Sequence, residues 1–569
     1  MTSQISQDLV RDAASQVRAA VVQAIERAQK SGALPQADIP GFVVEIPADT
    51  AHGDFASNIA MAGAKAFRAP PQKIASAILE NLALEDGFLA RAEIAGPGFL
   101  NFFLKEEWFA RVLLSVWALG ENYGKTDAGG GKKVMVEFVS ANPTGPMHMG
   151  NARGGAIGDC LAAVLEASGH QAHREFYVND AGNQIEKFGI SLRARYLQIF
   201  EGEENVPFPE DGYQGEDIRQ RAKEYADLHG DKLLSLPEEE QQAALVAFAL
   251  PANIEAMQRD LSDYRIRYDR WFRESSLYES GLVDKVVGIL TERGLTYEEE
   301  GALWYKASEF GAEKDEVLIR QNGNATYFAA DIAYHYDKFA LRGFDQVINV
   351  WGADHHGHVA RLKGAMDAVG LSGDRLDIVL MQLVRLMKDG EPYRMSKRSG
   401  HSVTLRDLLD LVPADAARFF FNMQQPGSSM DFDLSLAIEQ TSQNPVFYVQ
   451  YAHARICSII KKLAESGVAP RAVAQQELLL LSTPEERAIT RRLAQLPGEI
   501  ASAAQRMDPS ALTRYAMDLA TLFHKFYSAC RVQSDDEPLM QARLALCLCV
   551  RTALANTLSL MKIDAPQSM

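Results

Sequence analysis

The sequence is poor in several features that mark other classes of protein. Its five cysteines are odd in number and lack metal-ligand spacing, which predicts free thiols in a reducing compartment. No run approaches the length of a membrane span and the N-terminus has no signal-peptide core, so we expect a cytoplasmic protein that does not contact a membrane. The G-x-G-x-x-G fingerprint and the G-x-x-x-x-G-K-[ST] phosphate loop are both missing, which disfavours ordinary dehydrogenases and P-loop enzymes.

Positive charge is also scarce, with 58 Lys and Arg against 75 Asp and Glu and a net charge of −17. This balance argues against a uniformly basic nucleic-acid-binding surface. The acids are unevenly spread, however, since residues 201–217 hold seven of them and no base. Basic side chains near the C-terminus are candidate local RNA contacts, with a solvated helix face as the alternative. They are Arg487, Arg491, Arg492, Arg506, Arg514, Lys525 and Arg531.

A stretch between residues 134 and 155 joins a strand pattern to a helix pattern. Residues 134–139 are apolar and largely β-branched apart from Glu137, as in a parallel strand covered on both faces. A turn with proline and glycine ends this strand, and small residues lead into a helical segment that closes at Gly169. We therefore predict that a helix begins just after His148.

This strand, turn and helix together predict a site for an anion. The first backbone N–H groups of a helix are unpaired, and with the helix dipole they favour phosphate without any lysine. His148 lies beside them as a further hydrogen-bond donor. The residues His-Met-Gly-Asn at 148–151 are a weak signal by themselves, because a histidine next to a packing glycine also occurs as a simple loop cap.

A second motif strengthens this interpretation. Residues 391–400 read Glu-Pro-Tyr-Arg-Met-Ser-Lys-Arg-Ser-Gly, which resembles the K-M-S-K-S loop of class I aminoacyl-tRNA synthetases, while 148–151 resembles their H-I-G-H signature. In that family the two motifs lie in the two halves of one Rossmann-type domain and meet over ATP. Asn151 stands where the family usually has histidine, and Arg394 where it has lysine. Both substitutes can still donate hydrogen bonds.

Further segments narrow the resemblance to the arginyl-tRNA synthetase family and extend it over nearly the whole chain. They are residues 52–58, 96–102, 140–146, 177–184, 311–315, 327–333, 444–455 and 565–569. The resemblance implies an α/β fold: a Rossmann-type parallel-sheet catalytic domain with an insertion, an N-terminal α/β module and a C-terminal all-α helix bundle.

Composition and periodicity along the chain suggest where these domains lie. We expect the α/β module over 1–110, the catalytic domain over 125–430 with its insertion around 185–285, and the bundle over 435–569. The insertion is expected because an acidic, proline-containing segment and a charged helical pattern interrupt the nucleotide fold. By resemblance, the first module contacts the tRNA elbow and the bundle binds the anticodon.

Acidic residues in unusual places form a candidate pocket for a guanidinium group. An arginine side chain is a planar fork of donors that keeps its proton, so a selective pocket should offer carboxylate and hydroxyl acceptors. Tyr327 and Asp331 have a spacing that puts them on one helix face, with a local surface contact as the alternative. Glu137 lies in a buried strand, where an acid is costly unless paired, and we expect a cationic ligand as its partner.

The family resemblance assigns these residues and their neighbours to substrates. The residues implied for arginine are Glu137, Ser140, Asn142, Glu274, Tyr327, Asp331 and His355. Those implied for ATP are His148, Gly150, Asn151, Gly352, Asp354, Met395, Ser396 and Lys397. Catalytic roles fall to His148, Asn151 and Lys397, with Lys397 taking up charge on the departing pyrophosphate.

The polar cluster Trp-Gly-Ala-Asp-His-His-Gly-His at 351–358 follows the apolar run 347–350. This pattern suits the carboxyl edge of a parallel sheet, where ligands bind at a topological switch point. The histidines and the aspartate are also candidate zinc ligands, although no cysteine pair accompanies them. We favour a nucleotide and amino-acid site here and expect no resident metal.

The resemblance implies a ligase that uses ATP and Mg²⁺. It activates L-arginine to arginyl-adenylate, transfers it to the 3′-terminal adenosine of tRNA(Arg), needs bound tRNA for the first step and acts as a monomer. Three alternatives are a different class I synthetase such as the cysteinyl enzyme, a small-molecule nucleotidyltransferase and a non-catalytic tRNA-binding paralogue. The zinc cysteines of the first are missing, and the second would not need so long a helical region. Lys397, Glu137 and Asp331 argue against the third.

Overall fold

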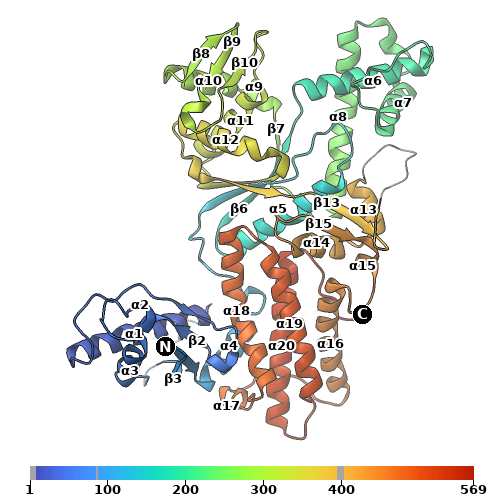
Figure 1. The fold of residues 1–569 in the computed structure, drawn as a ribbon. Coiled ribbons are helices and arrows are strands. Elements are labelled where there is room, and N and C mark those ends of the chain that lie inside the picture. The colour runs from blue at the N-terminus through green and yellow to red at the C-terminus, as the bar shows by residue number, and fades with distance from the viewer. Residues whose placement is uncertain (1–7, 85–86, 394–402) are drawn as a thin grey trace.

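The structure is a computed structural model that describes residues 8–84, 87–393 and 403–569 (Figure 1). A small α/β module lies beside a long helix bundle, and a parallel sheet lies between that bundle and two further groups of elements. The chain runs from the module through the sheet and ends in the bundle. The expected mixed α/β fold with a C-terminal helical region is therefore confirmed.

The N-terminal module packs helices on an antiparallel sheet with the strand order β1-β2-β4-β3. In its first helix Ala13, Val17, Val21 and Ala24 recur at helical spacing and are fully buried, which explains why this segment folds against the sheet. The elements are α1 (Leu9–Lys30), β1 (Val44–Glu45), β2 (Phe55–Ser57), α2 (Ile59–Ala62), α3 (Pro71–Glu80), β3 (Leu89–Ala95) and β4 (Phe99–Leu104). The connecting helix α4 (Glu106–Leu119) then leads to the central sheet.

The central sheet is parallel and has the strand order β12-β11-β5-β6-β7. Its strands are β5 (Lys133–Glu137), β6 (Gln171–Val178), β7 (Arg270–Arg273), β11 (Gln346–Gly352) and β12 (Leu376–Met381). The chain moves outward from β5 to β7 on one side and returns on the other side with β11. The topological switch therefore lies between β5 and β11, where ligands bind in open parallel sheets.

Helix α5 (Met149–Ala167) follows β5 and begins directly after His148, as predicted. It lies very close to the polypeptide that leaves β5, because a Cβ atom at Gly158 would come within 2.2 Å of the Phe138 side chain. Glycine at this position permits the contact. The close packing fixes the N-terminus of α5 at the end of the sheet where the switch point lies.

Two groups of elements interrupt the sheet order and stand on the side away from the bundle (Figure 1). The first follows β6, in the region where the sequence predicts an insertion, and consists of α6 (Asn183–Glu201), α7 (Glu216–His229) and α8 (Glu238–Asp263). The second follows β7 and contains α9 (Ser275–Glu279), α10 (Leu282–Glu292), β8 (Thr296–Glu299), β9 (Ala302–Tyr305), β10 (Glu316–Ile319) and α11 (Tyr327–Tyr336). Strands β8 to β10 form an antiparallel sheet that the sequence analysis did not predict, because they are short and only partly buried.

The remaining elements connect the central sheet to the bundle. Helix α12 (His356–Ala368) lies between β11 and β12, and after β12 come β13 (Val384–Lys388), β14 (Glu391–Pro392), α13 (Leu405–Leu411), α14 (Ala414–Met423), β15 (Met430–Asp433) and α15 (Leu434–Ile438). The bundle consists of α16 (Pro445–Glu465), α17 (Gln475–Leu478), α18 (Pro484–Arg506), α19 (Ser510–Ala529) and α20 (Glu537–Leu560).

Helix α20 is the one helix in the described part of the chain that is long and apolar enough to be considered as a membrane span. More than half of its apolar window, 56%, is buried inside the protein, where α20 packs against α16, α18 and α19. Its apolar character is thus explained by the bundle core. Cys547 and Cys549 are buried in this helix, and all five cysteines are free thiols, as the sequence predicts.

Arginines of α18 hold the N-terminal module against the bundle. Arg487 pairs with Glu106 and Arg491 pairs with Asp54, each at 2.6 Å. Both guanidinium groups also lie over the ring of Phe109. These arginines serve an interface between domains and do not form the free basic patch for RNA that the sequence suggested.

Candidate nucleotide and amino-acid site

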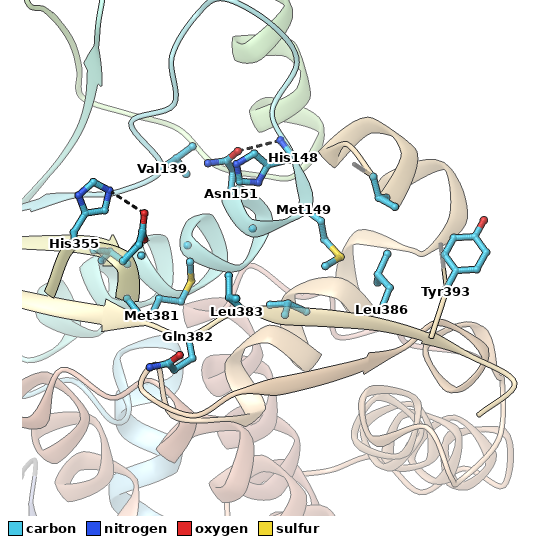
Figure 2. A pocket seen from close by; sticks show the side chains of 18 residues that line it. Val139, His148, Met149, Asn151, His355, Met381, Gln382, Leu383, Leu386 and Tyr393 are labelled. Atoms are coloured by element: carbon cyan, nitrogen blue, oxygen red, sulfur yellow. Dashed lines mark hydrogen bonds and ion pairs between the residues drawn. The ribbon is translucent and has the colours of Figure 1, made fainter. Parts of the chain in front are cut away.

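The N-terminus of α5 forms one wall of the site. The imidazole of His148, the residue before this helix, is partly buried, and burial lowers its pKa, so the ring is neutral near pH 7 and donates from one nitrogen. The backbone N–H of His148 donates to Oδ1 of Asn151 at 3.0 Å (Figure 2). Because this bond occupies the amide oxygen of Asn151, the amide NH₂ group is the end directed to a ligand.

A cavity of about 910 Å³ opens at this helix terminus (Figure 2). It lies at the switch point, because its lining comes from α5, from the end of β11 and from the segment after β12. Six of the predicted residues line it: His148, Gly150, Asn151, Gly352, Asp354 and His355. The structure therefore brings together residues that are separated by two hundred positions in the sequence.

Described residues on both sides of the basic motif line the same cavity. Met395, Ser396 and Lys397 lie outside the described residues, as does Arg394. The described residues on either side, Tyr393 and Val403, both line the cavity. The segment after the motif is also tied to α5, because the Met149 N–H donates to the Val403 carbonyl at 2.9 Å and the Leu405 N–H donates to the Met147 carbonyl at 2.8 Å.

A second cavity of about 1030 Å³ adjoins the first and shares His148, Asn151 and His355 with it. Ser140 and Asn142 line this cavity, together with residues 213–217 of the insertion. The backbone is strained where the two cavities meet, since Val139 and Ser140 have φ values of 70° and 42°. A positive φ is a genuine outlier for a β-branched residue, and such strain is concentrated at functional sites.

The side chains of Glu274, Asp331, Tyr177 and Tyr278 form a cluster, called the acidic pocket below, that is centred on Glu274. Its side chain is nearly inaccessible, with 1% of the residue exposed. Burial raises its pKa to about 7, and the nearby carboxylates of Asp331 and Asp180 act in the same direction. The phenols of Tyr177 and Tyr278 interact with this carboxyl group, and burial raises the pKa of both phenols, so they stay protonated.

Tyr327 and Asp331 both lie on α11, as their spacing predicts. Tyr327 is the more exposed of the two, at 40%. Asp331 accepts a hydrogen bond from Nε2 of His358 at 2.9 Å. Nδ1 of His358 accepts from Arg361 at 3.1 Å, and an imidazole with an accepting Nδ1 is a neutral donor at Nε2.

The zinc alternative for residues 351–358 finds no support. In the described part of the chain no group of three His, Cys, Asp or Glu side chains is placed to hold a metal ion. His358 points toward Asp331, whereas His355 is more than half exposed and lies 3.6 Å from Asp354.

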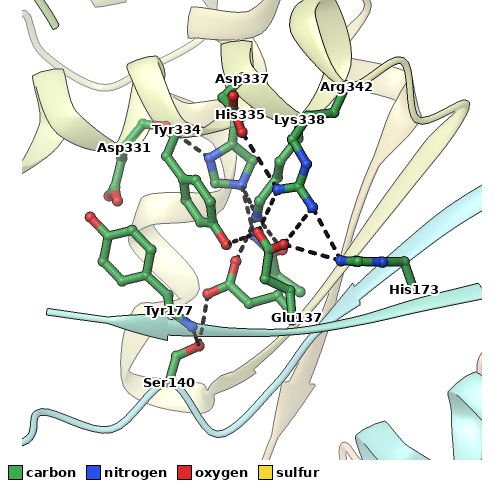
Figure 3. Close-up of polar contacts among 12 residues, drawn as sticks. Glu137, Ser140, His173, Tyr177, Asp331, Tyr334, His335, Asp337, Lys338 and Arg342 are labelled. Atoms are coloured by element: carbon green, nitrogen blue, oxygen red, sulfur yellow. Dashed lines mark hydrogen bonds and ion pairs between the residues drawn. The ribbon is translucent and has the colours of Figure 1, made fainter. Parts of the chain in front are cut away.

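Glu137 is already paired with a cation of the protein, which corrects the expectation from the sequence that a cationic ligand is its partner. The ammonium group of Lys338 lies 2.6 Å from its Oε2 atom, so the buried acid is already paired (Figure 3). Its other oxygen, Oε1, accepts from the Ser140 hydroxyl at 3.0 Å. The physical argument that a buried acid needs a cation was sound, but the cation belongs to the protein.

Sequence reasoning missed several residues of the site. Met381, Gln382 and Leu383 line the first cavity, and Leu383 is 83% exposed there. An apolar pair at the end of a buried strand looks like ordinary core in the sequence, so no local signal marks it. Lys338 carried a signal that could have been used, because it follows Asp331 at helical spacing.

Comparison with known proteins agrees with this geometry. A family model described as "tRNA synthetases class I (R), catalytic domain" matches residues 114–456, which include the parallel sheet and both cavities. Models described as "Arginyl tRNA synthetase N terminal domain" and "DALR anticodon binding domain" match residues 15–104 and 449–569. The fold and its site are those of a class I aminoacyl-tRNA synthetase.

A curated relative named arginine–tRNA ligase, from Caldanaerobacter subterraneus subsp. tengcongensis, is 53% identical over 99% of this chain and 100% of its own length. The chain therefore belongs to the arginyl-tRNA synthetase family. An arginyl-tRNA synthetase structure from Campylobacter jejuni has a TM-score of 0.74 at 33% identity and covers 82% of this chain and 100% of its own. The Thermus thermophilus arginyl-tRNA synthetase has a TM-score of 0.72 at 25% identity, with coverages of 96% and 99%.

Proposed function

We propose that this chain activates L-arginine with ATP and transfers the arginyl group to the 3′-terminal adenosine of tRNA(Arg). The arginine carboxylate attacks the α-phosphorus of ATP, the bond to the β-phosphate oxygen breaks, and arginyl-adenylate and pyrophosphate result. A ribose hydroxyl of the terminal adenosine then attacks the arginyl carbonyl and releases AMP. The protein contributes chiefly by positioning the reactants and stabilising developing charge.

We place ATP in the first cavity. The N-terminus of α5 offers backbone N–H groups and a positive dipole end to the phosphates, and His148 and Asn151 add two side-chain donors. The apolar side chains of Met381 and Leu383 offer a surface for the adenine ring. Gly150, Gly352, Asp354, Met395 and Ser396 complete this site, and the ammonium group of Lys397 neutralises charge on the leaving pyrophosphate.

We place the guanidinium of arginine in the acidic pocket. The observation that carries this assignment is that the buried carboxyl group of Glu274 and the partly exposed carboxylate of Asp331 lie near each other, and no described lysine or arginine is in contact with either. A buried acid beside a second acid is costly to ionise, and a guanidinium fork supplies the missing charge and donors together. Tyr327 adds a phenol at the outer end.

The other end of arginine then reaches the strained turn. Glu137, Ser140 and Asn142 bind its α-ammonium group, and His355 lies at the meeting point of the two cavities. The carboxylate is thereby directed toward the first cavity, where the α-phosphate of ATP lies. Attack requires the reacting atoms to be held about 3 Å apart, which this arrangement of neighbouring cavities favours.

We assign the second cavity to the terminal adenosine of tRNA. It opens between the strained turn and the α6–α8 insertion, next to the position of the adenylate. The α-helical bundle binds the anticodon, and the N-terminal module contacts the tRNA elbow. The family resemblance implies that arginine activation requires bound tRNA.

Mg²⁺, oligomeric state and location complete the proposal. Mg²⁺ enters with ATP and neutralises phosphate charge, since the described residues offer no carboxylate cluster for a resident ion. The chain acts as a monomer in the cytoplasm. Equilibrium sedimentation of the purified protein at micromolar concentration tests the proposed monomeric state, and a mass of two or more chains would contradict it.

Aminoacylation of total tRNA with each labelled amino acid in turn tests the main proposal. Arginine alone should be transferred, and only to arginine-accepting tRNA. Efficient transfer of another amino acid, or none of arginine, would refute the assignment. ATP–pyrophosphate exchange with arginine should stay near background until tRNA is added, and brisk exchange without tRNA would contradict the tRNA requirement.

A further inference from the structure

Four acidic side chains surround the arginine end of the site, and they differ in how their charge is balanced. Glu137 pairs with Lys338 at 2.6 Å, and Glu175 pairs with Arg342. Burial alone would raise the pKa of Glu175, but hydrogen bonds from His173 and Arg342 bring it down to about 2. Glu274 and Asp331 have no such partner among the described lysines and arginines. The protein therefore neutralises the acids at one end of the pocket and leaves the other end negative.

Lys338 is held firmly in this arrangement. Its side chain has no exposed surface, and its ammonium lies 3.9 Å from the centre of the Tyr334 ring. Nζ also lies 3.3 Å from Oδ1 of Asn349 and 3.4 Å from Nε2 of His335. Burial and the charge of Lys338 keep the pKa of His335 well below its usual range, so this neighbour adds no second positive charge.

The position of Lys338 follows from the geometry of α11. Tyr327, Asp331 and Lys338 succeed one another along a single side of this helix and of the π-helical turn Asp337–Leu341 that continues it. Turns of this kind occur frequently at functional sites. One helix thus carries an acid for the pocket and, two turns deeper, the cation that neutralises the acid of β5 (Figure 3).

We infer that Lys338 is a positioning residue that sets the direction in which a substrate with two cationic groups binds. This inference rests on the proposed function. Oε2 of Glu137 faces Lys338, and Oε1 faces Ser140, where the α-ammonium is proposed to bind. Since Lys338 already balances Glu137, a cation at that end gains hydrogen bonds but little net charge attraction. A cation beside Glu274 and Asp331 gains both hydrogen bonds and net charge attraction. The guanidinium group therefore binds at that end.

The test compares two small probes that each represent one end of arginine. Butylguanidine and butylamine are measured as inhibitors of arginine-dependent ATP–pyrophosphate exchange, with tRNA present, at pH 8.5. The wild-type protein should bind butylguanidine about ten-fold more tightly or better, as expected for a fork facing two acids. In Lys338→Met, Glu137 becomes an unbalanced acid, and the ratio of the two inhibition constants should shift toward butylamine by about five-fold or more.

A role in folding alone would weaken both probes together and leave their ratio unchanged, and that result overturns the inference. Lys285→Met removes an exposed lysine from α10 and should leave the ratio as in the wild type. If Lys338→Met does not fold, Asn349→Asp keeps the lysine and places a competing carboxylate beside it. That variant should shift the ratio in the same direction, and an unchanged ratio there also overturns the inference.

The same measurements separate this inference from the proposed function. A wild-type protein that neither transfers arginine nor binds butylguanidine refutes the proposed function. A wild-type protein that does both, with an unchanged ratio in the variants, refutes only the role of Lys338. The double variant Lys338→Met/Glu137→Gln should be no worse in arginine activation than Glu137→Gln, because Lys338 acts through Glu137. If the double variant lost the sum of the two single-variant losses in arginine activation, Lys338 would not act through Glu137.

Discussion

The two ends of the site are built in opposite ways. The end proposed for the nucleotide is centred on one continuous strand, turn and helix, although the end of β11 and the segment after β12 also line its cavity. Its proposed binding groups are the backbone N–H groups of this helix beside His148 and Asn151. The amino-acid end is assembled from separate elements, with Glu137 on β5, Glu274 before α9 and Asp331 on α11. The first end depends on local geometry, whereas the second depends on buried charges that long-range packing brings together.

This difference affects how each end should respond to mutation and to pH. Backbone donors do not titrate and are fixed by the close packing of α5 on the sheet. The pKa of a buried carboxyl group depends on its partners: that of Glu274 is raised to about 7, whereas that of Glu175 is lowered to about 2. Changes at the nucleotide end should therefore act on ATP with little dependence on pH, and changes at the amino-acid end should act on arginine.

The largest effect is expected from Lys397→Ala. Removing a cation that stabilises the leaving pyrophosphate should lower arginine-dependent ATP–pyrophosphate exchange by about 1000-fold. Binding of tRNA, measured by filter binding, should change by less than about two-fold, because Lys397 acts on the transition state of activation. Equal losses of exchange activity and tRNA binding would contradict a specific role of Lys397 in arginine activation.

Asp331→Asn should show the largest difference between its effects on arginine binding and on ATP binding. Loss of one of two acids facing the guanidinium should raise the KM for arginine by about 100-fold, whereas the KM for ATP should stay within about two-fold. Steady-state kinetics with each substrate varied in turn measures both values. Asp374→Asn, at an exposed acid, is the matched control. A comparable rise in both KM values would show that the ends are not independent.

The pH dependence of arginine binding should come from Glu274. Its pKa is raised to about 7, chiefly by burial, and the guanidinium needs the ionised form. The ionised fraction grows as the pH rises from 6 to 8, so affinity for arginine should increase roughly ten-fold and then level off. Isothermal titration over this range measures it. The Glu274→Gln variant should bind arginine weakly at every pH. If its affinity for arginine still rose ten-fold between pH 6 and 8, another group would be responsible for the pH dependence.

The smallest effect is expected from Gly150→Ala at the nucleotide end. A Cβ atom there would lie 3.0 Å from the His148 ring, so the imidazole must shift slightly. The KM for ATP should rise by about five-fold and the KM for arginine should not change. Gly154→Ala, one turn further along α5, meets only an ordinary contact at 3.6 Å and serves as the control. Equal effects of the two variants would argue against a special position for His148.

The sequence predicted the start of α5 and the fold class well because their signals are local. The start of α5 after His148 is confirmed, and so are the parallel sheet and the helical C-terminal region. The small sheet of β8 to β10 escaped prediction because short, half-exposed strands lack a clear hydrophobic alternation. The roles proposed for the individual site residues stay predictions.

The charge partners were harder to predict. Glu137 was expected to meet a cationic ligand and meets Lys338, and Arg487 and Arg491 were expected to face RNA and hold the N-terminal module. The two arginines were candidate RNA contacts with a solvated helix face as the alternative, and neither possibility named Glu106 and Asp54 as their partners. In each case the sequence shows that a charge is present but not what lies opposite. Pairing depends on a separation of a few ångströms between atoms, and periodicity carries no information about that distance.

The sequence by itself determined the start of α5 after the turn, the parallel α/β fold and the family, because these follow from short motifs and regular hydrophobic patterns. Only the tertiary structure decided which acids stay unbalanced and which cations are already used. Lys338 and Glu137 lie 201 positions apart and meet only because α11 packs against the sheet. Electrostatic energy depends on distance in space, and a chain fixes such distances only when it folds.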